Sequence, residues 1–361
     1  MPMDDSANSL MAENKGAGSN SLSRLVAERV GWHRIGVVLS LLVIVFALVV
    51  LYHLLQDIEV DQVIAAIKET SVSDVVYAAV FVASAYFTLT FYDLFALRTI
   101  RHHDVPYRVA ALAAFTSYSV GHNVGASIFS AAAVRYRIYS NYGLDATDVA
   151  KLSFVAGLTF WLGNATVLGL GIAFVPSAAG AIDQLPGWVN RGLAILTLAI
   201  LYSYIVWVWR KPRLIGRGQW QVELPSGPFT LLQILIGIVD LSCCALAMYM
   251  LMPDEPHLGF VPLAVIFVSA TLLGFASHAP GGIGVFDAAM LVALWQMDKE
   301  QLLAGLLLFR LLYYIVPFVL SLTILGVREL LLNFAWASGR PNIVPPSAGA
   351  PDHAGKKTDR V

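Results

Sequence analysis

Charged residues are scarce in this chain: Asp, Glu, Lys and Arg make up 13% of its 361 residues. A soluble domain carries about 25% charged residues. The few charges stand in short clusters, and the apolar runs between them are long enough to cross a hydrocarbon core about 30 Å thick. A soluble fold would have to bury all of these runs at once, so the scarcity of charge excludes an ordinary soluble protein.

Cysteines, metal-ligand spacings and catalytic motifs are also scarce or absent in the sequence. Cys243 and Cys244 are the only cysteines, and they are adjacent within an apolar run, which excludes a disulfide framework or a thiolate metal site. His122 and His278 have no second ligand at metal-binding spacing. The sequence also lacks H-E-x-x-H and G-x-S-x-G motifs and paired carboxylates on one membrane helix face. We therefore expect no metal, no cofactor and no catalytic residues.

The overall charge gives no indication of a nucleic-acid partner. The formal net charge is −1, and no basic stripe or base-stacking motif is present. The two ends of the chain are polar and of low complexity, and residues 1–30 lack the order of a signal peptide. We predict disordered cytoplasmic tails at 1–30 and 336–361, leaving 31–335 as an integral membrane helical domain.

Hydrophobic residues, by contrast, make up 58% of the chain, and its mean hydropathy is +0.70. Runs of about 20 apolar residues predict membrane-crossing helices. Six such runs are present, at 35–55, 75–97, 149–175, 192–208, 229–251 and 302–325. Because Lys and Arg are enriched in short cytoplasmic loops, the alternation of basic and acidic clusters between these runs predicts that both termini are cytoplasmic.

Two further apolar stretches are interrupted in the middle. Residues 109–133 have basic clusters on both sides, and residues 261–297 contain a Pro-Gly-rich interruption, so we predict two re-entrant hairpins entering from opposite faces. The predicted helix breaks are Gly121, His122 and Asn123 in the first, and Pro280, Gly281, Gly282 and Gly284 in the second. The fold class is therefore an all-α polytopic membrane protein with about six full transmembrane helices and two broken re-entrant helical hairpins of opposite orientation.

Two ionisable residues stand within predicted spans. Asp93 should face protein or water, since a charge at membrane depth costs roughly 2.5 to 3.5 kcal/mol; alternatively it is an interfacial charge one turn from Arg98. Arg310 interrupts the last span. Arg310 binds either a carboxylate such as Asp287 or a phosphate headgroup. Alternatively, its side chain extends toward the outer surface.

Arg135 and Arg137 follow the first hairpin and alternate with aromatic residues. Two arginines beside a broken helix can clamp a phosphate, but the same pattern is typical of a cytoplasmic anchor in an aromatic belt. The run 280–284 lacks a following Lys-Ser or Lys-Thr and is not a nucleotide-binding loop. The N–H groups that begin the next helix could receive an anion, or the run forms a tight turn alone.

Several of these stretches together resemble a known family. The resemblance is to the membrane-embedded, flippase-type region of the lysylphosphatidylglycerol synthase group, or multiple peptide resistance factor, and its stand-alone YbhN-like relatives. It covers roughly residues 35 to 330 and is carried by 92–98, 121–123, 134–139, 142–144, 159–163, 279–287 and 309–314. Asp287 stands where the family more often has Glu, and the small residues before Arg135 are less rich in glycine.

The resemblance implies the lipid-translocating half of such a synthase, in a bacterial-type plasma (inner) membrane. Full-length synthases continue into a cytoplasmic domain that uses aminoacyl-tRNA, and we expect that this chain does not make the aminoacylated lipid itself. The headgroup-binding candidates are Arg135, Arg137, Arg310, Asp287 and Asp93.

Three functions remain open from the sequence. The first is a flippase or transporter whose partner is a membrane phospholipid, working passively or on an ion gradient because no nucleotide-binding motif is present. The second is a non-transporting partner subunit for a separate synthase or envelope enzyme. The third, an intramembrane enzyme using Asp287 or Asp93 as acid or base, has the least support because no nucleophile accompanies them.

Overall fold

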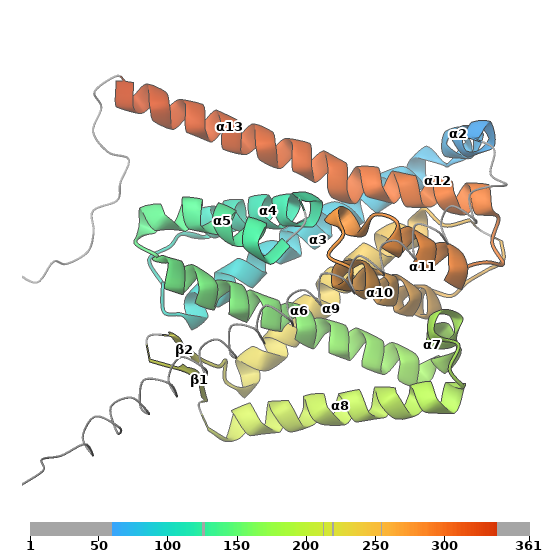
Figure 1. Ribbon diagram of the computed structural model, residues 1–361, viewed down its shortest axis with the longest axis horizontal. Helices are drawn as coiled ribbons and strands as arrows, with labels where there is room; N and C mark the ends of the chain where they lie inside the picture. The colour runs from blue at the N-terminus through green and yellow to red at the C-terminus, as the bar shows by residue number, and fades with distance from the viewer. Residues whose placement is uncertain (1–59, 125–126, 212, 219, 254, 338–361) are drawn as a thin grey trace, which may run out of the picture.

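The computed structural model describes residues 60–124, 127–211, 213–218, 220–253 and 255–337, and these are helical almost throughout (Figure 1). The predicted span at 35–55, the tail at 1–30 and residues 338–361 of the second tail lie outside the described residues. The last helix continues to Ala337.

Five helical stretches of the described chain are long and apolar enough to cross a membrane. They confirm the five predicted spans that can be compared, with ends within a few residues of the expected ones. They are α3 (Val72–Thr99), α6 (Ala146–Phe174), α8 (Gly187–Arg210), α9 (Gly227–Met250) and the Lys299–Arg328 portion of α12 (Lys299–Arg310), η3 (Leu311–Ile315) and α13 (Val316–Ala337). Together with the two interrupted stretches they confirm the all-α polytopic fold class.

Local polar residues mark where several of these helices begin. The Asp145 side chain accepts a hydrogen bond from the Asp148 N–H at 2.7 Å, which satisfies a donor in the first turn of α6. Asp298 does the same for the Gln301 N–H at the start of α12. Pro176 stands at the start of α7 (Pro176–Asp183), where its missing N–H does no harm.

The second interrupted stretch is broken where predicted. α10 (Phe260–Ala276) and α11 (Val285–Ala293) are joined through the single turn η2 (Pro280–Gly282). Gly281, Gly282 and Gly284 have φ values of 60°, 61° and 83°, a region that other residues rarely adopt. The Pro-Gly run therefore reverses the chain between two short apolar helices.

The first interrupted stretch differs from the prediction in the position of its break. α4 (Tyr107–Val124) and α5 (Ser127–Tyr139) pack side by side (Figure 1), but Gly121, His122 and Asn123 lie inside the last turns of α4. The helix continues through them because Gly121 is packed in the interior and the Asn123 amide donates to the Ser119 carbonyl, one turn earlier. Arg135 and Arg137 accordingly lie within α5, which leads into η1 (Ser140–Tyr142).

A small antiparallel sheet, not predicted from the sequence, joins α8 to α9. β1 (Leu214–Arg217) pairs with β2 (Trp220–Glu223), with Leu214 opposite Glu223. Arg101 Nη2 lies 2.7 Å from Glu223 Oε2 and connects the loop after α3 to this sheet. The loops carrying predicted cytoplasmic basic clusters thus gather at one end of the molecule, whereas α7 and α2 (Val60–Glu69) lie toward the other end (Figure 1).

The interior depends on close approach between helices. A Cβ atom added to Gly163 of α6 would lie 2.7 Å from the Cα atom of Gly237 in α9, so both positions require glycine. The outer surface is apolar, as expected for contact with lipid. Exposed large side chains on α8, for example, include Trp188, Ile195, Ile200, Tyr202 and Trp209.

Candidate functional site

A buried ion pair joins α3 to α5. Asp93 is fully buried and Arg135 is 4% exposed. Arg135 Nε lies 3.0 Å from Asp93 Oδ2, and Arg135 Nη2 lies 2.7 Å from Asp93 Oδ1. This two-point contact is the strongest geometry available to an arginine and a carboxylate. Asp93 therefore faces protein, as the energetic argument from its depth predicted.

Aromatic residues complete the surroundings of this pair. The Tyr139 hydroxyl donates to Asp93 Oδ2 at 2.9 Å. The Arg135 guanidinium lies over the Tyr118 ring of α4, 4.7 Å from its centroid, a favourable cation–π distance. The pair is thus neutralised and enclosed by three helices, and a lipid headgroup would have to displace Asp93 to reach Arg135.

Arg137 lies apart from Arg135. Residues two positions apart in a helix point in different directions, and Arg137 is exposed while Arg135 is buried. The two arginines therefore do not form a joint phosphate clamp in this conformation, and the pattern that suggested one reflects sequence proximity within α5.

A second ion pair lies at the interruption between α10 and α11. Arg310, the last residue of α12, places Nε 2.9 Å from Asp287 Oδ1 and Nη2 2.6 Å from Asp287 Oδ2. This is the partner that the sequence suggested for Arg310. The side chains of Arg310 and Asp287 are 15% and 12% exposed, so this pair is more accessible than the Asp93–Arg135 pair.

The same two residues hold the glycine-rich turn in place. Arg310 Nη1 donates to the Gly281 carbonyl at 3.1 Å, and the Gly284 N–H donates to Asp287 Oδ2 at 3.0 Å. The anion-binding position that the sequence suggested at the start of α11 is therefore held by the Asp287 carboxylate of the chain itself, where a negative charge is favourable.

The two interrupted stretches meet where α4 contacts η2, and η3 of the last span packs beside them. A Cβ atom at Gly281 would lie 3.7 Å from the His122 carbonyl oxygen. The Asn123 amide donates to the Tyr314 carbonyl at 3.1 Å, and the Tyr86 hydroxyl donates to the Tyr313 carbonyl at 3.0 Å. η3 is a π-helical turn that directly follows Arg310. Such turns widen a helix locally and are frequent at functional sites.

The sequence reasoning missed one buried acid, Asp240 of α9. It is 4% exposed, and its Oδ2 atom accepts a hydrogen bond from the Tyr92 hydroxyl at 3.0 Å. The signal was present, because Asp240 is the one charged residue within the apolar run 229–251. A single carboxyl does not interrupt so long an apolar run, so the run predicts a crossing helix whatever the carboxyl does.

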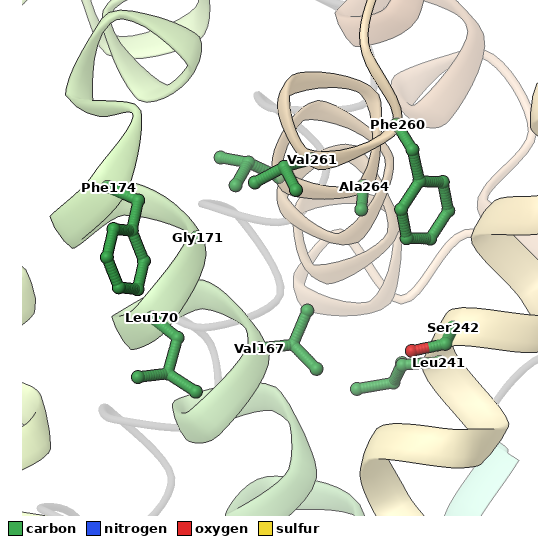
Figure 2. Close-up of a pocket in the computed structure, with 10 residues that line it drawn as sticks. Val167, Leu170, Gly171, Phe174, Leu241, Ser242, Phe260, Val261 and Ala264 are labelled. Carbon is green, nitrogen blue, oxygen red and sulfur yellow. The ribbon is translucent and has the colours of Figure 1, made fainter.

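An apolar cleft of about 200 Å³ lies between α6, α9 and α10 (Figure 2). Figure 2 shows Val261 of α10 on the side of Val167, Leu170 and Phe174 of α6, and Phe260 of α10 on the side of Leu241 and Ser242 of α9. Leu170, Phe174 and Val261 are also partly exposed on the outer surface. The cleft is therefore open toward the lipid side and nearly devoid of polar atoms.

No group of three or more potential metal ligands occurs among the described residues, and Cys243 and Cys244 are free thiols. The carboxylates and guanidinium groups in the described membrane interior include two arginine–carboxylate pairs and one further acid, Asp240.

Comparison with known proteins identifies a family that matches most of this chain. Residues 35–321 match the family described as the lysylphosphatidylglycerol synthase TM region. The chain belongs to this family. It is an integral membrane protein, and both arginine–carboxylate pairs lie within the matched region.

Two relatives consist largely of this region. The uncharacterized protein slr0712 of Synechocystis is 31% identical over 249 residues, covering 68% of this chain and 76% of that protein. The inner membrane protein YbhN of Escherichia coli is 27% identical over 300 residues, covering 81% and 91%.

Other relatives are much longer. The phosphatidylglycerol lysyltransferase of Staphylococcus haemolyticus is 26% identical over 304 residues, which cover 79% of this chain and 34% of that protein. The match thus covers about a third of the lysyltransferase.

Proposed function

We propose that this family member moves phospholipid between the leaflets of a bacterial inner membrane. The observation that carries the proposal is the partly exposed Arg310–Asp287 pair, which lies at a broken helix and is more accessible than the buried Asp93–Arg135 pair. An ionic group at membrane depth is costly, and in membrane proteins it marks substrate or ion pathways.

Arg310 suits a phosphate headgroup. Its planar guanidinium can make two parallel hydrogen bonds to a phosphate as readily as to a carboxylate. While no lipid is bound, the Asp287 carboxylate accepts the Arg310 hydrogen bonds that the headgroup phosphate would accept. An exchange of one anion for the other keeps Arg310 paired with an anion, while the released Asp287 carboxylate keeps the Gly284 N–H as a donor.

The cleft between α6, α9 and α10 suits an acyl chain. Its lining is apolar, and it opens toward lipid, so a tail can remain in a hydrocarbon environment while the headgroup crosses. Relatives are consistent with a lipid substrate: the longer ones are named phosphatidylglycerol lysyltransferases, and one shorter one is an inner membrane protein. We infer that the substrate is a phospholipid with an anionic or zwitterionic headgroup, such as an aminoacylated phosphatidylglycerol.

A translocation assay with purified protein tests the proposal. Proteoliposomes containing a fluorescent phosphatidylglycerol, phosphatidylethanolamine or phosphatidylcholine analogue are compared with protein-free vesicles of the same composition. We expect faster movement of at least one headgroup class and a large loss of this movement in Arg310→Ala at matched reconstitution. Gly157→Ala serves as a control because the position has open space beside it.

A second function is a non-transporting partner subunit for a separate synthase or envelope enzyme. The observation that favours it is the complete pairing of Arg135 and Arg310 with carboxylates, as in a purely structural role. It predicts no movement of any lipid above protein-free vesicles. The same assay therefore separates the two functions.

A further inference from the structure

Asp240 is the least compensated acid in the described membrane interior. Asp93 and Asp287 are each held by an arginine, whereas no ion pair within the described residues involves Asp240. Its Oδ2 atom has the Tyr92 hydroxyl as a donor, but its buried Oδ1 atom has no hydrogen-bond partner. Asp240 is also near the middle of α9, far from either end of that helix.

A carboxylate in this position is expensive, because a buried charge needs a counter-charge or several donors. The single Tyr92 hydroxyl supplies neither a counter-charge nor several donors. Binding a proton removes the charge and leaves a neutral acid whose remaining oxygen costs much less to bury. The position therefore favours a carboxyl that holds a proton and releases it when its surroundings change.

The groups around Asp240 are aromatic hydroxyls and thiols. Tyr92 and Tyr86 approach from α3, Tyr118 from α4 and Tyr313 from η3, and the thiols of Cys243 and Cys244 lie on the same helix. His122 stacks on Tyr313 at 5.8 Å between ring centroids, and its Nδ1 atom is buried without a partner. These groups are titratable side chains that surround the Asp240 carboxyl without supplying an opposite charge.

Asp240 is connected to the Asp93–Arg135 pair through α3. Tyr92 and Asp93 are consecutive residues and point to different neighbours: Tyr92 reaches Asp240 on α9, and Asp93 reaches Arg135 on α5. The Tyr118 ring contacts both Tyr92 and Arg135. Its centroid lies 6.0 Å from the Tyr92 ring centroid and 4.7 Å from the Arg135 guanidinium carbon. Three contacts therefore connect Asp240 to Arg135: Asp240–Tyr92, Tyr92–Tyr118 and Tyr118–Arg135.

We propose that Asp240 is a proton-binding site that couples lipid movement to a proton gradient. The inference rests on the proposed transport function. A proton adds to a carboxylate oxygen of Asp240 from one side of the membrane and leaves to water on the other side, and no covalent bond of the lipid changes. The ionised carboxylate accepts a stronger hydrogen bond from the Tyr92 hydroxyl than the neutral acid does, so each proton exchange changes the strength of this contact between α3 and α9.

Lipid translocation under an imposed pH gradient tests the coupling. The proteoliposomes contain fluorescent phosphatidylglycerol, and potassium with valinomycin holds the membrane potential at zero. We expect the wild type to move lipid several-fold faster with the gradient than without it. Asp240→Asn, which is isosteric with the protonated acid, should move lipid at a rate that does not respond to the gradient.

Two further measurements keep the result decisive. Tyr92→Phe removes the hydroxyl donor and should reduce the response to the gradient even if Asp240→Asn fails to fold. Infrared spectra at neutral pH should show the carbonyl stretch of a protonated carboxyl in the wild type that is absent from Asp240→Asn, whether or not lipid moves.

The outcomes separate the two proposals. Wild-type movement that ignores the gradient, or an equal response in wild type and Asp240→Asn, would overturn the coupling while leaving lipid transport intact. An absence of movement for every lipid tested would instead overturn the transport function and with it the coupling.

Discussion

Single charged residues define the interior of this protein. The cost of an ionic group at membrane depth was sufficient to select Asp93 and Arg310 from the sequence. It was also sufficient to suggest the Arg310–Asp287 pair, which the structure contains. The Asp93–Arg135 pair was not foreseen, because 42 positions separate the two residues and their contact depends on how α3 packs against α5.

Removing one member of the enclosed pair should be costly. Asp93→Ala leaves Arg135 buried without a counter-charge, and such a change destabilises by about 3 to 5 kcal/mol. Tyr139→Phe removes one hydrogen bond to the same carboxylate, and we expect a smaller loss of about 1 to 3 kcal/mol. Thermal unfolding of the purified variants in one detergent measures both, and equal losses would contradict the importance assigned to the ion pair.

At the scale of helices, the positions of apolar runs were sufficient to predict α3, α6, α8, α9 and the α12–α13 stretch. The Pro-Gly run predicted the turn between α10 and α11, because those residues adopt backbone conformations that others avoid. The break between α4 and α5 was misplaced, since the side chain of Asn123 satisfies backbone groups at the helix end in a way that sequence alone does not reveal. The small sheet has only four residues in each strand, so the alternation of apolar and polar residues from Trp220 to Glu223 was too short to predict it.

The contact between α6 and α9 gives a matched pair of glycine variants. Gly163→Ala would place a Cβ atom 2.7 Å from the Gly237 backbone, so the helices must separate and stability should fall. Gly157→Ala, six positions earlier on α6, meets open space and should be neutral or stabilising by up to about 1 kcal/mol. Unfolding temperatures of the two variants provide the comparison, and a similar shift in both would contradict this packing.

The π-helical turn η3 depends on side chains from α3 and α4. Asn123→Ala removes the donor to the Tyr314 carbonyl, leaving that carbonyl without this bond in a widened helix. We expect faster amide hydrogen exchange in residues 311–318 than in the wild type. Thr197→Ala on exposed α8 is the control, since its hydroxyl contacts its own helix. Unchanged exchange around η3 in Asn123→Ala would show that the turn does not rely on this bond.

At the scale of the whole molecule, basic loops gather at one end, which agrees with the charge rule used to predict orientation. Cysteine labelling tests the predicted orientation. Each of two variants carries one new cysteine, in a background in which Cys243 and Cys244 are replaced by Ala. Arg217→Cys and Leu185→Cys flank α8 at opposite ends, and both sites are exposed. We expect an impermeant maleimide added to intact spheroplasts to label position 185 but not 217. The reverse labelling would invert the predicted topology.

The purpose of the Arg310–Asp287 pair is best tested by removing both charges together. Replacing a whole ion pair is often nearly neutral for stability, whereas removing one partner is not. The double variant Asp287→Asn/Arg310→Gln should therefore unfold close to the wild-type temperature and yet lose phospholipid translocation in proteoliposomes. A double variant that is equally stable and still moves phospholipid at the wild-type rate would contradict a headgroup role for Arg310.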